Sequence, residues 1–143
     1  MEDDTIKLLR ECNAGVKMGI SSFDDVIEHV KDSRLKELMK KSRETHSRIG
    51  DKIHKCLEKY HDDGKEPSTM ARVMSWTKTN FKLGEEESDR TAADLITDGC
   101  NMGIKSLYRY MHQYQAADKE SKDLTKELIQ AEETLVKDLR EYL

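Results

Sequence analysis

Four long stretches of the chain place apolar residues three or four positions apart, which is the spacing of one face of an α-helix. We expect helices from about Thr5 to Lys31, from the Asp32–Ser33 break to about His61, from about Glu85 to about Ala116, and from the Asp118–Ser121 turn to the C-terminus. The first of these apolar stripes is Ile6, Leu9, Asn13, Val16, Ile20, Phe23, Ile27 and Val30. The pattern predicts an all-α protein.

Turn signals divide the four helices into two hairpins. Asp32–Ser33 and Asp118–Ser121 are short, cap-like breaks, so each should join two antiparallel helices. A longer break contains the only proline, Pro67, and precedes a predicted short helix, about Thr69 to Leu83, that crosses the bundle. We therefore expect one domain, 1–143, made of hairpin 1 at about 5–61, a crossover at about 62–84 and hairpin 2 at about 85–143.

The second hairpin repeats the first. The segment Gly99–Leu107 matches Gly15–Phe23 at an offset of 84, with five of the nine positions identical. The second helices of the two hairpins correspond at an offset of 86. Each matching segment has two glycines within strongly helical sequence, where glycine is normally avoided. We call the level of these glycines the waist, and we predict a four-helix bundle of two duplicated αα-hairpins.

Composition narrows the protein class. The chain has 143 residues, 38% of them charged, and a net charge of −4, which argues against a simple nucleic-acid binder. No apolar run approaches a membrane span, and the opening residues do not resemble a signal peptide. The cysteines, Cys12, Cys56 and Cys100, lack the C-x-x-C spacing of a metal site, so we expect reduced thiols in a cytoplasmic protein.

Charge is unevenly distributed along the chain. The segment Lys31–Lys59 has ten Lys or Arg against five acids, whereas Glu85–Asp98 has six acids against one Arg. The two segments could form complementary surfaces in a dimer or a higher oligomer. Alternatively, Lys40, Lys41 and Arg48 could form a basic face for nucleic acid. Ordinary solvated helix faces are the favoured interpretation.

Four polar residues interrupt the apolar stripes. Asn13 and Thr97 occupy matching positions in the two hairpins, and so do His46 and Glu132. Counted from the turns, His46 lies level with residue 18 and Glu132 level with residue 104. Both should therefore face the glycines of the waist. Burying such groups is unfavourable unless they find partners.

Two interpretations of the waist remain open. His46, Glu132 and Cys100 could bind a single metal ion such as zinc, because imidazole, carboxylate and thiolate are all zinc ligands. The favoured alternative is a buried hydrogen-bonded cluster in which Arg43 or His46 pairs with Glu132. The glycines could likewise leave room for a ligand or, as we favour, allow close helix packing.

These features resemble the ferritin-like superfamily, in particular the rubrerythrin-related bacterial ferritin-like domains of unknown function. The resemblance rests on the duplicated hairpin, the crossover, and the segments Gly99–Tyr108 and Glu44–His46. It covers nearly the whole chain. It implies a four-helix bundle with iron or peroxide chemistry.

The ligand positions of a di-metal bundle depart from that resemblance. Such bundles take a Glu from each of two helices and Glu-x-x-His from each of the other two. The corresponding residues here are Val16, Cys100, Arg43 with His46, and Ile129 with Glu132. One of the two histidines remains and no glutamate stands where a ligand glutamate is required, so the resemblance implies a degenerate di-metal site.

We therefore predict a non-catalytic binding or structural protein that has lost di-iron chemistry and needs no cofactor. The alternatives are a metal-storage protein or oxidoreductase with iron or zinc at a rearranged site, and a nucleic-acid-associating oligomer. We expect self-association and no membrane partner; the sequence identifies no protein partner.

Overall fold

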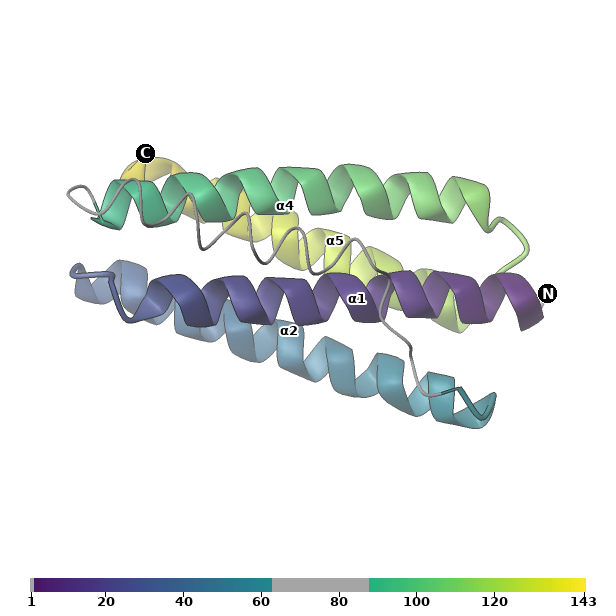
Figure 1. Ribbon diagram of the computed structural model, residues 1–143. Coiled ribbons are helices and arrows are strands. Elements are labelled where there is room, and N and C mark those ends of the chain that lie inside the picture. The colour runs from purple at the N-terminus through teal and green to yellow at the C-terminus, as the bar shows by residue number, and fades with distance from the viewer. Residues whose placement is uncertain (1, 63–87) are drawn as a thin grey trace.

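The computed structural model describes residues 2–62 and 88–143. Its elements are α1 (Glu2–Ile27), α2 (Ser33–Lys59), α4 (Ser88–Gln113), α5 (Lys119–Leu139) and a short 3-10 helix, η2 (Arg140–Tyr142) (Figure 1). The described residues contain no strand, which confirms the all-α prediction. The predicted crossover helix, 69–83, lies outside these residues. Within the same ranges, no helix is both apolar enough and long enough for a membrane span.

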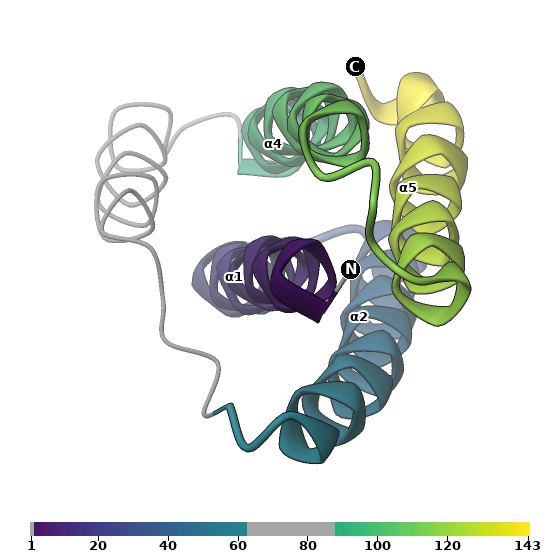
Figure 2. The same ribbon diagram turned by 90° about the vertical axis from the view of Figure 1, so that its right-hand side faces the viewer.

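The four long helices surround one interior (Figures 1 and 2). Helix α1 packs against α2 and α4, and α5 packs against α4 and α2, so each helix has a neighbour on either side. The two helices of each hairpin, α1 with α2 and α4 with α5, run in opposite directions, as their short connections predict. The arrangement is consistent with a four-helix bundle.

In each hairpin, one aspartate caps the start of the second helix. The side chain of Asp32 accepts a hydrogen bond from the backbone N–H of Leu35 at 2.9 Å, and that of Asp118 accepts one from Ser121 at 2.8 Å. Each satisfies a backbone donor that has no partner inside the helix. The prediction of a turn over Asp118–Ser121 is corrected in one respect: only Asp118 is non-helical, and α5 already begins at Lys119.

Other helix ends also differ from the prediction: α1 begins at Glu2 and not at Thr5, α2 ends at Lys59 and not at His61, and α5 ends at Leu139, before the C-terminus. Two further ends have a visible cause or a larger shift. Helix α1 ends at Ile27 and not at Lys31, because the backbone N–H of Val30 bonds to the carbonyl three residues earlier and Val30 turns into the core. Helix α4 ends at Gln113 and not at Ala116. Apolar periodicity continues through these closing turns, so it extends a predicted helix too far.

The core consists of two apolar clusters, one toward each end of the bundle. The first includes Leu9, Val16, Ile49, Ile53, Leu107 and Leu128. The second includes Phe23, Leu35, Met39, Ile96, Leu135 and Leu139. His46 lies in α2 between Met39 and Ile49, and Glu132 lies in α5 between residues of the two clusters. The polar pair therefore interrupts an otherwise apolar interior at mid-height.

Candidate functional site

His46 and Glu132 meet inside the bundle. His46 Nε2 lies 3.7 Å from Glu132 Oε1, and the two side chains are only 2% and 8% exposed. One comes from the middle of α2 and the other from the middle of α5, where the apolar stripe of each helix turns inward. Two ionisable groups are thus held against each other away from water.

The waist glycines make room for these two side chains. A Cβ placed on Gly19 would lie 3.0 Å from Cδ2 of His46, and one on Gly103 would lie 2.6 Å from Oε2 of Glu132. The predicted level of both polar residues is therefore correct. Among the described residues, nothing lies within 4 Å of a Cβ at Gly15 or Gly99. Of each glycine pair, only the second member is needed to accommodate a side chain from the facing helix.

The orientation of the His46 ring is set by its own helix. Nδ1 lies 2.8 Å from the carbonyl oxygen of Ser42, which can only accept a hydrogen bond, so Nδ1 carries a proton and donates. The ring of Phe23 packs edge-on against it, with ring centres 5.3 Å apart and planes at 72°. These contacts direct Nε2 toward Glu132.

The pair needs one proton between its two facing atoms. A neutral imidazole whose Nδ1 is protonated has a lone pair on Nε2, and a carboxylate oxygen is also an acceptor. The contact is favourable either as imidazolium with carboxylate or as neutral imidazole with a protonated Glu132. Burial raises the pKa of Glu132, and His46 opposes that shift. Either arrangement is neutral overall.

The second carboxylate oxygen of Glu132 lacks a hydrogen-bond partner within the described chain. Oε2 is buried and has no hydrogen-bond partner among the described residues. The hydroxyl oxygen of Thr97, one of the polar residues predicted on the stripes, is also buried without a hydrogen-bond partner among the described residues. Buried polar groups without a partner are uncommon, and each costs free energy. These two oxygen atoms are therefore available to accept a hydrogen bond or to bind a ligand.

The third predicted ligand, Cys100, is buried, and burial followed by the charge of Glu132 raises the pKa of its thiol. A thiol must lose its proton to bind zinc. Within residues 2–62 and 88–143, no three His, Cys, Asp or Glu side chains gather in a group able to hold a metal ion. A di-iron centre, which needs several carboxylates, does not fit the donors described at the waist. Single-metal binding by His46, Glu132 and Cys100 stays a prediction.

Comparison with known proteins adds no family to this geometry. No protein-family model, curated protein or solved structure matches the chain. The ferritin-like resemblance therefore depends on the quoted residues and remains a hypothesis.

Arg43 does not reach the waist. Its Nε donates to Asp24 Oδ1 at 2.6 Å on the surface between α2 and α1. The partner of Glu132 is therefore His46, and the alternative in which Arg43 supplies the counter-charge is excluded by this contact. The predicted basic residues Lys40, Lys41 and Arg48 are exposed on α2, so a nucleic-acid face there remains a prediction.

A shallow groove leads from the surface to His46. It lies between α2 and α5, has a volume of about 390 Å³, and includes His46 and Ile49 in its wall. Ser42 and Ala131 are small residues that line the same groove. The groove therefore borders the His46 imidazole, although that side chain is only 2% exposed.

Sequence reasoning missed two partners of the site residues. Ser42 precedes His46 by four residues, and that spacing within a helix could have identified its carbonyl as the acceptor. Asp24 lies 19 residues from Arg43 on another helix, and no local pattern relates the two.

Proposed function

We propose that this chain is a non-catalytic binding or structural bundle of ferritin-like descent, with a one-proton His46–Glu132 pair where related bundles hold metal. The descent is supported by the equivalence of the two halves. Gly19 and Gly103 differ by the same offset of 84 as the repeat, and His46 and Glu132 by the offset of 86 of the second helices. In each hairpin, a polar side chain of the second helix therefore packs onto the equivalent glycine of the first helix.

One observation carries the proposal. The spaces left by Gly19 and Gly103 are occupied by the His46 ring and the Glu132 carboxylate. Two metal ions need several carboxylates to neutralise and bridge them. Among the described residues, the waist offers the carboxylate of Glu132, and it already faces the imidazole of His46. We therefore propose that this protein binds its partners through the exterior of the bundle.

Elemental analysis tests this function directly. We expect protein purified without chelator to contain well under about 0.1 iron or zinc per chain, and its melting temperature to be unchanged by EDTA. Stoichiometric iron or zinc that His46→Ala removes would overturn the proposal. The matched control is Arg43→Ala, which changes a nearby residue of the same helix whose side chain is turned outward.

A mononuclear metal protein is the second candidate, and the geometry of His46 favours it. Metal-binding histidines commonly donate their other ring nitrogen to a backbone carbonyl, as His46 does to Ser42. Oε2 of Glu132 has no partner among the described residues, and the α2/α5 groove reaches the imidazole. His46 and Glu132 would hold the ion, with Cys100 as the predicted third ligand. The same elemental analysis distinguishes the two candidates.

A further inference from the structure

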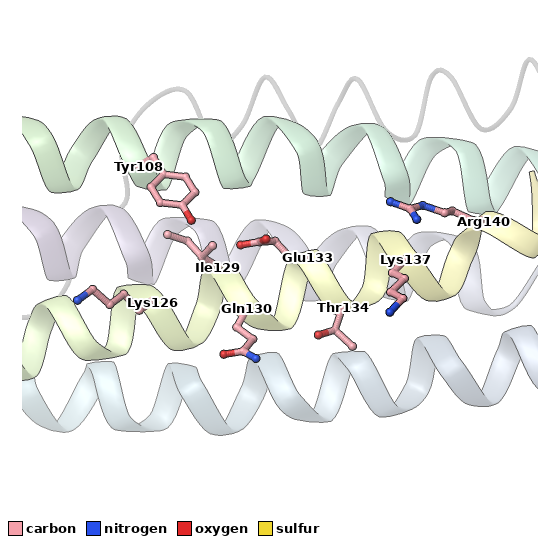
Figure 3. Close-up of a pocket in the computed structure, with 8 residues that line it drawn as sticks. All are labelled: Tyr108, Lys126, Ile129, Gln130, Glu133, Thr134, Lys137 and Arg140. Atoms are coloured by element: carbon pink, nitrogen blue, oxygen red, sulfur yellow. The ribbon is translucent and has the colours of Figure 1, made fainter.

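Of the two grooves described among residues 2–62 and 88–143, the larger has a volume of about 520 Å³ and lies on the outer surface of α5, with Tyr108 of α4 at its edge. Tyr108 projects from α4 over Ile129 of α5, Lys126 and Lys137 lie along α5, and Arg140 follows it at the start of η2 (Figure 3). Tyr108 is 46% exposed and is one of three large hydrophobic residues in the described part that face solvent to this extent. We call this surface the α4/α5 face.

The cations of the α4/α5 face are not neutralised within the described chain. Lys126, Lys137 and Arg140 are exposed, and no ion pair involves any of them. Three acids of α5 bind other lysines: Glu120 binds Lys59, Asp123 binds Lys119, and Glu127 binds Lys52. Among the described residues that line the groove, Glu133 is the one acid.

Helix α4 has exposed charges at helical spacing from Tyr108. Asp94, Asp98 and Lys105 therefore lie on the same side of α4 as Tyr108. None of the three forms an ion pair among the described residues. Partial burial and the charge of Asp94 raise the pKa of Asp98. A nearby cation would relieve this repulsion.

The two charge patterns are in register along the bundle. Gly103 of α4 lies level with Glu132 of α5, and the helices are antiparallel. Asp98 precedes Gly103 by five residues and Lys137 follows Glu132 by five, so they share a level. By the same count Asp94 lies near the level of Arg140, and Lys105 lies within one turn of Glu133. Along the bundle, the charges of Asp94, Asp98 and Lys105 are therefore opposite in sign to those at the same levels beside them, which are Arg140, Lys137 and Glu133.

We propose that the α4/α5 face binds the same face of a second copy of this chain, through a two-fold axis parallel to the helices. Such an axis lays α4 of each copy on α5 of the other at the same level. Asp98 then meets Lys137 of the second copy, Asp94 meets its Arg140, and Lys105 meets its Glu133. Each contact occurs twice, and Tyr108 lies opposite Lys126, where a lysine can pack on the ring.

The charges disfavour the other two-fold arrangement. An axis perpendicular to the helices at the waist would lay α5 on α5, and Lys126 of one copy would face Lys137 of the other. Like charges brought together at an interface are unfavourable. The parallel axis places opposite charges together at all three matched levels.

The size of the face sets the expected strength. Two neighbouring helices of about 21 residues span roughly 30 Å by 20 Å, or about 600 Å² on each copy. That is the lower end of specific interfaces, so we expect a dissociation constant in the micromolar range that weakens with salt. The dimer depends on the outer face alone and stands whether or not the waist binds metal.

Charge exchange between two variants tests the interface. Lys137→Glu/Arg140→Glu makes both helices acidic on this face, and Asp94→Lys/Asp98→Lys makes both basic. In sedimentation velocity of the full chain, we expect each variant alone to dimerise at least about tenfold more weakly than wild type. Mixed in equal amounts, they should form a heterodimer at least as tight as the wild-type dimer, because both contact sets become attractive.

Far-UV circular dichroism of each variant verifies that exposed substitutions leave the fold intact. The matched control is Lys40→Glu/Lys41→Glu on α2, which reverses as much charge away from the face and should leave dimerisation unchanged. A wild-type chain that remains monomeric at about 0.5 mM overturns the proposal, since micromolar association would be complete there. A dimer that the exchange variants do not weaken, or a mixture that does not associate, also overturns it.

Discussion

The two halves of the waist share a geometry and differ in chemistry. In the first hairpin the His46 ring covers Gly19, donates from Nδ1 to the Ser42 carbonyl, and is supported by Phe23. In the second, the Glu132 carboxylate covers Gly103, yet its Oε2 has no hydrogen-bond partner among the described residues. The first polar group is positioned by its own half of the bundle. The second depends on a residue of the opposite half.

Under the descent proposed above, this difference is what remains of a polar centre whose metal ligands have been lost. A buried carboxylate alone is strongly unfavourable, and an imidazole alone is not. Glu132, whose burial costs more free energy, lies in the second hairpin, and His46, which can donate a proton to it, lies in the first.

His46→Ala should be the most destabilising of these substitutions. It leaves Glu132 buried without a partner and opens a cavity, so we expect a loss of about 3–5 kcal/mol in the free energy of unfolding near pH 8. Urea denaturation measures it. In the Glu132→Gln background, the same change should cost about 1–2 kcal/mol less, because no buried charge remains. Equal costs in the two backgrounds would show that the residues are not coupled.

The matched glycines give an intermediate effect. Gly103→Ala places a methyl group against the Glu132 carboxylate, whereas Gly99→Ala meets no atom within 4 Å among the described residues. Replacing glycine in a helix stabilises by about 0.5–1 kcal/mol where the methyl fits. We expect Gly103→Ala to be about 1–3 kcal/mol less stable than Gly99→Ala in thermal or urea unfolding. Equal stabilities of the two variants would show that the Glu132 carboxylate does not need a glycine at position 103.

Much of this arrangement follows from the sequence. The three- and four-residue spacing predicts each helix, and counting from Asp32 and Asp118 places His46 and Glu132 at the glycines. Sequence cannot decide whether Arg43 or His46 meets Glu132, because a rotation of α2 by part of a turn would exchange them. The contact between Arg43 and Asp24 settles that rotation. The exact helix ends depend on a few backbone hydrogen bonds that periodicity does not encode.

Arg43→Ala should have the smallest effect. Its ion pair with Asp24 has side chains 41% and 52% exposed, and such surface pairs contribute about 0–0.5 kcal/mol. Chemical denaturation in low salt measures this change beside His46→Ala. If Arg43→Ala were as harmful as His46→Ala, Arg43 and not His46 would be the counter-charge of Glu132.

The proton of the buried pair makes stability depend on pH. Burial raises the pKa of Glu132, and a carboxyl group whose pKa is raised by folding stabilises below its unfolded value and loses that contribution as pH rises. An unfolded glutamate loses its proton near about pH 4.3, whereas the folded Glu132 keeps it to higher pH because its pKa is raised. The folded state therefore binds more protons than the unfolded state in the range above that value. Stability should therefore fall as the pH rises through this range.

The central claim is that His46 and Glu132 share one proton in place of a bound metal, and the pH dependence of unfolding tests it most directly. Urea denaturation of wild type and Glu132→Gln at several values between about pH 4 and pH 9 gives the two slopes. We predict that wild type loses up to about 1.4 kcal/mol more per pH unit than Glu132→Gln, the slope of one linked proton. The variant keeps the shape of the side chain, and its amide can donate to His46 Nε2. Equal slopes for the two proteins would contradict the account.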